Sequence, residues 1–192
     1  MLRTSHLLRR TLAAALLMLL GACGAQDPEL PWREVQLNEA RMLAYFPCEP
    51  EVARTPVDFG MGDGPVMVSM MGCDAIDSTY AISHWLLDDA ERADDALAFW
   101  QAAVLTKLKA VDGKNFKSGA PFVPAGAMPL SRSIQATVEG EGAAGWTMTT
   151  HGVWFARKEG DKARIIHAVI YAPKPYHDLA RQFFDRLVLL DE

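Results

Sequence analysis

Three histidines carry the side chains in this chain that are best suited to binding a metal ion. His151 and His167 lie in two stretches that are predicted to be neighbouring β-strands, 146–157 and 163–172. A hairpin turn centred on Glu159 would place the two imidazoles directly opposite each other across the strand pair. Neutral imidazole nitrogens in that arrangement could ligate zinc or copper, with His84 as a third ligand.

The register of that hairpin decides whether such a site can form. A turn of four or five residues changes the pairing, and a slip of one residue puts the two side chains on opposite faces of the sheet. Neither His151 nor His167 belongs to a tightly spaced ligand motif. We therefore favour structural histidines and expect no metal and no cofactor, with His84, His151 and His167 kept as candidate ligands.

Motifs for covalent catalysis or phosphate binding are missing from the sequence. It has no Gly-x-Ser-x-Gly elbow and no Ser-x-x-Lys pair. The spaced glycines Gly60, Gly62 and Gly64 are followed by Pro65 rather than by a helix, which disfavours a phosphate-binding loop. The sequence thus favours a protein that is not an enzyme, and an enzyme with a scattered site stays open as an alternative.

The first 23 residues are organised like a secretory leader. Arg3, Arg9 and Arg10 form a cationic start, and residues 12–20 form an apolar run. This run is shorter than the roughly 20 residues that a transmembrane helix needs. It ends in Leu20-Gly21-Ala22-Cys23, which resembles the lipobox of bacterial lipoproteins. The alternative is an ordinary cleaved signal peptide that happens to contain a cysteine.

The lipobox resemblance implies how and where the protein is held. It implies removal of the signal peptide, residues 1–22, and attachment of diacylglycerol and a further acyl chain such as palmitate at Cys23. Two or more acyl chains anchor a protein stably in a membrane. Gly24 occupies the position after the lipidated cysteine, where a protein retained in the inner membrane would have Asp. We therefore expect a lipid anchor in the outer membrane, facing the periplasm rather than the cell surface, with the inner membrane left open.

Cleavage would also change the charge and the domain organisation. The leader holds three of the 19 basic residues and none of the 24 acidic ones, so the net charge of −5 becomes −8. An acidic domain disfavours nucleic acid as a partner and gives no polybasic attraction to lipid headgroups. We expect residues 23–31 to be the lipidated N-terminus and a tether, and residues 32–192 to form a single domain.

With Cys23 lipidated, Cys48 and Cys73 remain as a pair, and an exported protein would join them in a disulfide bond. Strands at 51–59 and 66–73 would run antiparallel after a turn at 60–65, which brings Cys73 beside Cys48. A redox pair or a zinc site is the alternative. The sequence has no Cys-x-x-Cys spacing, which favours a structural disulfide.

The order of predicted elements indicates an α+β domain built from antiparallel hairpins. In chain order, we predict strands at 41–47, 51–59, 66–73 and 78–87, a helix at 88–112, strands at 130–139, 146–157 and 163–172, a helix at 175–187, and a short strand at 188–190. Residues 116–129 form a long irregular connection between the first helix and the strand that follows it. For the first helix, Asp88 with Glu91 predicts a cap, Asp94 or Asp95 could cap a later start, and Gly113 is the expected stop.

This pattern resembles the PsbP/Mog1-like α-β-α sandwich, including a first strand that runs into Phe46-Pro47. The resemblance spans most of the mature chain and implies an accessory or binding module. Our primary hypothesis is therefore a non-catalytic, lipid-anchored envelope protein that binds a protein or another envelope component. The alternative is a periplasmic metal- or small-ligand-binding protein that uses His151 and His167.

Overall fold

The computed structural model describes residues 30–110, 114–116, 119–142 and 145–191. Pro31–Glu192 forms one compact unit, and Met1–Leu30 is a separate unit of which only Leu30 is described. The lipobox and Cys23 lie outside the described residues. The compact unit contains both apolar cores, all the paired strands and the disulfide bond, so it has what a domain needs to fold by itself.

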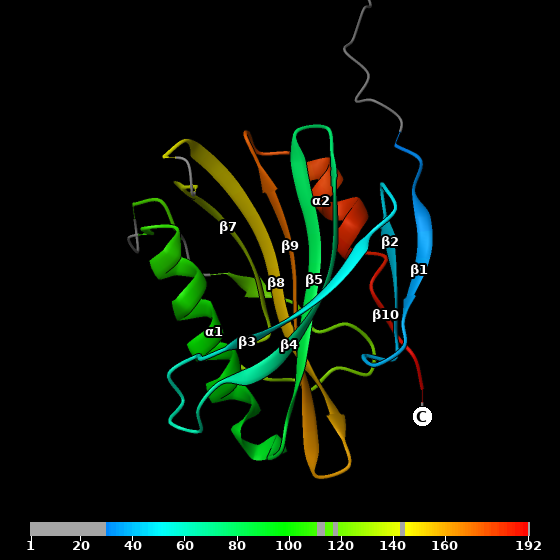
Figure 1. The fold of residues 1–192 in the computed structure, drawn as a ribbon, viewed down its shortest axis with the longest axis vertical. Helices are drawn as coiled ribbons and strands as arrows, with labels where there is room; N and C mark the ends of the chain where they lie inside the picture. Colours follow the sequence, from blue (N-terminus) through cyan, green and yellow to red (C-terminus); the bar gives the residue numbers. More distant parts are fainter. Residues whose placement is uncertain (1–29, 111–113, 117–118, 143–144, 192) are drawn as a thin grey trace, which may run out of the picture. The chain divides into compact units, whose positions relative to one another are not determined.

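A seven-stranded antiparallel sheet forms the centre of the unit (Figure 1). Strands that are neighbours in this sheet are also consecutive in the chain, except for β5, which pairs with β9. In spatial order the strands are β3 (Glu51–Val57), β4 (Val66–Ala75), β5 (Ser78–Leu87), β9 (Lys162–Ala172), β8 (Thr147–Glu159), β7 (Ile134–Glu141) and β6 (Ala120–Pro121).

The remaining elements cover the two faces of this sheet (Figure 1). One face packs against α1 (Ala93–Lys107), which follows the short 3₁₀ turn Ala90–Arg92. The other packs against α2 (His177–Phe184) and a small antiparallel sheet of β1 (Arg33–Leu37), β2 (Met42–Phe46) and β10 (Val188–Leu189). We call these the α1 face and the α2 face. The predicted α+β class with antiparallel hairpins and two main helices is confirmed.

The alternation of side chains along the strands creates one core on each face. The α1-face core contains Trp85, Leu97, Trp100, Trp154 and Ile165. The α2-face core contains aromatic and aliphatic side chains from β2, β5, β8, β9 and α2, among them Phe46, Tyr80, Phe155, Ile166 and Phe183. Both cores exclude water from apolar surface, which is the main favourable contribution to folding.

Cys48 and Cys73 form a disulfide bond with their Cα atoms 6.0 Å apart, as predicted. β3 and β4 pair antiparallel with Glu51 opposite Gly72, and this register brings the two cysteines together. The bond closes a loop with a sequence separation of 25. Constraining a loop of this length in the unfolded chain is worth about 3 kcal/mol in chain-entropy models.

Several element boundaries differ from the prediction. Asp89, and not Asp88, caps the 3₁₀ turn that precedes α1, since its side chain accepts a hydrogen bond from the Glu91 backbone N–H. At the start of α1 itself, the side chain of Arg92 makes no capping hydrogen bond. Helix α1 then ends at Lys107 instead of continuing to 112. Lys109 adopts a positive φ of 51°, its N–H bonds to the Thr106 carbonyl, and the Ala110 N–H bonds to Leu105. Lys109 therefore takes the C′ position of a Schellman motif, four residues before Gly113, the expected stop.

Candidate functional site

The histidines predicted opposite each other do not pair. In the β8–β9 hairpin Glu159 pairs with Lys162, so the turn is the two-residue loop Gly160-Asp161, with a φ of 62° at Gly160. The register therefore differs by three residues from a turn centred on Glu159. His151 lies opposite Ile170, and His167 lies opposite Trp154. Because the shift is odd, His151 faces the α2 side and His167 the α1 side.

His167 is packed as an aromatic ring in the α1-face core. It stacks on Trp154 with ring centroids 4.5 Å apart, and the edge of Trp100 lies 5.3 Å away. Gly152 makes this stack possible, because a Cβ atom there would lie 2.7 Å from the Trp154 ring and 3.2 Å from His167 Nε2. Burial lowers the pKa of His167 to about 3, so its imidazole is neutral. Its surroundings are those of a structural histidine.

His151 and His84 lie on the α2 face, and each has one buried ring nitrogen without a hydrogen-bond partner among the described residues. His151 Nδ1 is 2.9 Å from Thr137 Oγ1, and its ring contacts His177 at 5.2 Å. Burial, with the nearby His177, lowers the pKa of His151 to about 4. Burial, with the charge of Arg164, lowers that of His84 to about 4 as well.

The three candidate histidines are therefore not brought together into one ligand set. Among the described residues no three His, Cys, Asp or Glu side chains are grouped so that they could hold a metal ion.

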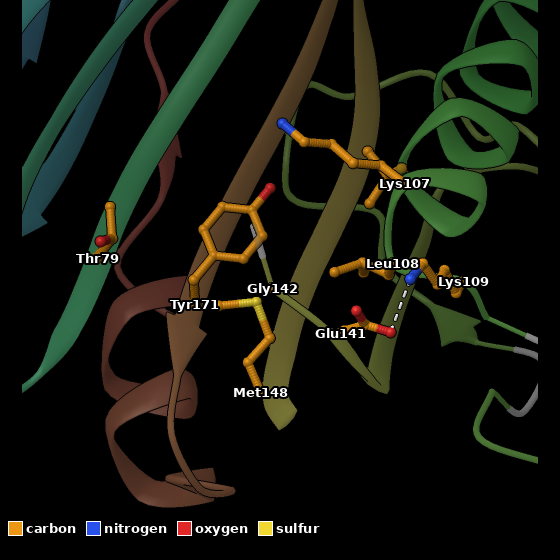
Figure 2. A pocket seen from close by; sticks show the side chains of 9 residues that line it. Thr79, Lys107, Leu108, Lys109, Glu141, Gly142, Met148 and Tyr171 are labelled. Carbon is orange, nitrogen blue, oxygen red and sulfur yellow. Dashed lines mark hydrogen bonds and ion pairs between the residues drawn. The ribbon is translucent and has the colours of Figure 1, made fainter. Parts of the chain in front are cut away.

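A pocket of about 510 Å³ lies between the C-terminal end of α1 and the sheet (Figure 2). Val104, Lys107 and Leu108 line it from the helix side, and Thr79, Met148 and Tyr171 from the strands. Thr79 on β5 pairs with Tyr171 on β9, so these two side chains share the α1 face. We call this cavity the α1 pocket.

The end of α1 is held close to β7 because β7 has a glycine at the contact. The Glu141 N–H donates to the Leu108 carbonyl at 3.2 Å. A Cβ atom on Gly140 would lie 2.6 Å from that same oxygen. A side chain at Gly140 would thus push the helix end away from the sheet and change the shape of the α1 pocket.

The polar groups of the α1 pocket divide into paired and unpaired ones. Lys109 Nζ is 2.8 Å from a Glu141 carboxylate oxygen, and the Thr79 hydroxyl donates to Asp74 at 2.6 Å. Lys107 makes no ion pair with another described residue, and the Tyr171 hydroxyl makes no hydrogen bond with one. Burial raises the pKa of Tyr171, so its hydroxyl keeps its proton and can donate.

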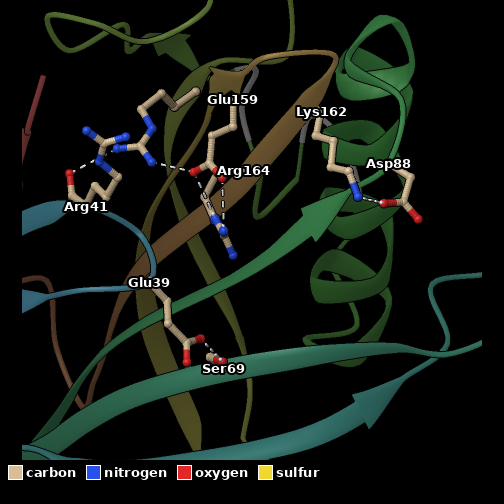
Figure 3. A network of polar contacts seen from close by, with 8 residues as sticks. Glu39, Arg41, Ser69, Asp88, Glu159, Lys162 and Arg164 are labelled. Atoms are coloured by element: carbon tan, nitrogen blue, oxygen red, sulfur yellow. Dashed lines mark hydrogen bonds and ion pairs between the residues drawn. The ribbon is translucent and has the colours of Figure 1, made fainter. Parts of the chain in front are cut away.

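A second polar cluster lies on the α2 face at the turn end of the β8–β9 hairpin (Figure 3). Glu159 accepts two hydrogen bonds from Arg164, at 3.0 and 3.2 Å, and is also paired with Arg157. Burial opposes ionisation of Glu159, but the hydrogen bonds from Arg164 and Arg157 hold the pKa of its carboxyl below the usual value.

This cluster ties the hairpin to other parts of the chain. Arg157 donates to the Arg41 carbonyl at 3.0 Å, which also accepts from the Leu190 N–H at 2.8 Å. The cluster therefore connects the hairpin to the segment before β2 and to the C-terminal segment. Its charges are paired with one another, which is the arrangement of a structural clamp and not of an open binding site.

Sequence reasoning did not single out Lys107 or Tyr171. Lys107 lies near the end of the predicted helix at 88–112, and Tyr171 lies in the predicted strand at 163–172. They are 64 positions apart in the sequence, and only the β5–β9 pairing and the packing of α1 bring them to one cavity.

No protein-family model matches this chain, and the comparison with curated proteins finds no match. Its function must therefore be inferred from its own residues. Over the described part of the chain, no helix is both long enough and apolar enough to cross a membrane.

Proposed function

We propose that this chain is a lipid-anchored protein of the bacterial cell envelope whose domain is a non-catalytic binding or accessory module in the periplasm. The observation that carries the proposal is the Cys48–Cys73 disulfide. Disulfides persist in oxidising compartments such as the periplasm and are rare in the cytosol. The leader and the lipobox-like Leu20-Gly21-Ala22-Cys23 independently support export.

The binding role is supported by the α1 pocket. It combines apolar side chains with a small number of polar groups, the composition that small-molecule sites usually have. Lys107 and Tyr171 offer hydrogen-bond donors at the pocket that no described residue uses. A joint metal site of His84, His151 and His167 is not part of this proposal, because His167 faces the opposite side of the sheet from the other two.

Metabolic labelling of the full chain tests the anchor. We expect an alkyne-tagged palmitate to label the wild-type protein in a bacterial host and the Cys23→Ser variant to lose the label and the membrane fraction. Cys48→Ser is the matched control, because it also replaces one cysteine by serine and should keep the label. Unlabelled wild-type protein free in the periplasm would contradict the proposal.

The destination is tested separately by membrane fractionation. We expect the labelled protein to sediment with outer-membrane markers, since Gly24 follows the lipidated cysteine. Crosslinking in intact cells before extraction then tests the accessory role, because a binding module should give a reproducible crosslinked envelope species. Crosslinkers can be placed at positions in the α1 pocket and on the surface of the sheet. Recovery of uncrosslinked monomer alone from all these positions would argue against a protein partner.

A further inference from the structure

We propose that the α1 pocket binds a small organic anion with a short apolar body, such as a medium-chain monocarboxylate. This inference deepens the proposed binding role and rests on it, but it does not depend on the lipid anchor. Three features of the pocket support it: its charge balance, its unpaired polar groups and the shape of its apolar lining.

The charge balance of the α1 pocket is positive. Lys107, Lys109 and Glu141 are the charged residues that line it. Lys109 and Glu141 are paired at 2.8 Å, which leaves the charge of Lys107 uncompensated by a described residue. Figure 2 shows the Lys107 side chain extending from α1 toward the strand side of the pocket, where Tyr171 lies. A bound anion would therefore meet a single ammonium group that has no competing carboxylate.

The hydrogen-bonding groups that remain free are donors. The Schellman motif occupies the carbonyls of Leu105 and Thr106, and the Leu108 carbonyl accepts from Glu141. The Tyr171 hydroxyl, which burial keeps protonated, is unpaired. A ligand headgroup at this place must accept hydrogen bonds, and carboxylate oxygens are acceptors only. A cationic or purely donating headgroup would find Lys107 and no free acid.

The rest of the lining is apolar and of limited size. Val104, Leu108 and Met148 face the cavity beside the two polar groups. Methionine adapts its shape to different apolar ligands. The cavity of about 510 Å³ lies within the range typical of small-molecule sites, about 300–1,000 Å³. A chain of about eight carbons with a charged end fits this combination better than a bare inorganic anion, which would leave the apolar surface uncovered.

Three probes separate the headgroup from the apolar body. Octanoate carries both, octanamide keeps the body without the charge, and acetate keeps the charge without the body. The titrations use the compact unit Pro31–Glu192, which contains both cores and the disulfide. We expect calorimetry to show octanoate binding at least about tenfold more tightly than either of the other probes.

Two variants and one control locate the binding. Lys107→Gln should weaken octanoate binding about three- to tenfold, and Tyr171→Phe about threefold, because each removes one headgroup contact. Lys158→Gln is the matched control, since Lys158 is exposed near the turn end of β8, away from the pocket. Lys107→Gln should change the binding of octanamide, which has no charge, by no more than about twofold.

The outcomes are distinct from those of the anchoring test. Absence of octanoate binding, or equal binding of octanoate and octanamide with Lys107→Gln unaffected, would overturn this inference while palmitate labelling at Cys23 remained intact. Loss of the palmitate label with octanoate binding preserved would instead overturn the anchor and leave the pocket assignment standing.

Discussion

On its α2 face the seven-stranded sheet is covered by a helix together with a three-stranded sheet, and on its α1 face by one helix. Helix α1 packs mainly on the central strands β8 and β9. Seven strands at the usual spacing span roughly 30 Å, whereas a helix with its side chains is roughly 10 Å wide. A single helix therefore cannot cover such a sheet.

Cavities on the two faces follow from this difference. Near the two ends of α1 lie the α1 pocket of about 510 Å³ and another of about 420 Å³ that includes Phe59, Trp85 and Arg92. On the α2 side a cavity of about 190 Å³ lies beside His84 and Arg54, and one of about 410 Å³ lies at the β6–β7 edge of the sheet beside Gln135, Thr137 and Glu139. The two cavities beside α1 lie where the helix ends and the sheet continues, so these recesses are available for binding.

The largest expected effect tests whether the α2 face is closely packed. Phe183→Ala should lower the free energy of unfolding by about 3–5 kcal/mol. Phe183 is fully buried, and its ring lies 5.5 Å from both Phe46 and Tyr80. Urea unfolding provides the measurement. Phe99→Ala on α1 is the control and should have a far smaller effect, since Phe99 is 43% exposed. Similar losses for both variants would refute the contrast in packing.

The second prediction concerns the clamp at the turn end of the β8–β9 hairpin on the α2 face. Glu159→Gln should destabilise the protein by about 3 kcal/mol, because it leaves the largely buried Arg157 and Arg164 without their carboxylate. Lys162→Gln in the same hairpin removes the exposed pair with Asp88, which should contribute less than about 1 kcal/mol. Chemical denaturation of both variants compares them directly, and equal losses would mean that Glu159 is not a clamp.

A third prediction tests how tightly the middle of the α1 face is packed. Gly152→Ala should lower stability by about 1–3 kcal/mol, because its Cβ would meet the Trp154 ring at 2.7 Å. Trp154→Phe in the same chain should recover part of this loss, since the smaller ring leaves room. The thermal unfolding midpoints of the two single variants and the double variant give the coupling. Strictly additive midpoint changes would show that the two residues do not compete for space.

The smallest expected effect is a change in how steeply the free energy of unfolding depends on pH. The pKa of His167 is about 3 in the folded protein, below the ordinary value of 6.5. The unfolded chain therefore takes up a proton first, so this stabilisation is complete above about pH 6.5 and is lost as the pH falls toward 3. His84 and His151, with pKa values of about 4, act in the same direction.

Removing one of these histidines should flatten the slope. In His167→Gln the free energy of unfolding should fall with decreasing pH less steeply, by up to about 1.4 kcal/mol per pH unit. Urea midpoints at pH 7, 6 and 5 measure this. An unchanged slope would mean that His167 takes up its proton equally well in the folded core.

The local sequence was sufficient wherever a pattern repeats along one segment. Strand β5 was predicted with the bounds observed, because apolar residues alternate through Tyr80 and Ile82. The Cys48–Cys73 bond was predictable because one hairpin joins the two cysteines. Strand β1 was missed, since its five residues contribute few buried side chains and gain their order from pairing with β2.

The sequence by itself determined the α+β class and the disulfide, because each depends on periodicity or spacing within a continuous segment. Only the tertiary structure decided which face each histidine occupies, because the two-residue turn at Gly160 sets the register of the whole hairpin. The tertiary structure also created the α1 pocket. Lys107 and Tyr171 are far apart in the chain, and they line the same cavity only because β5 pairs with β9 and α1 ends early against the sheet.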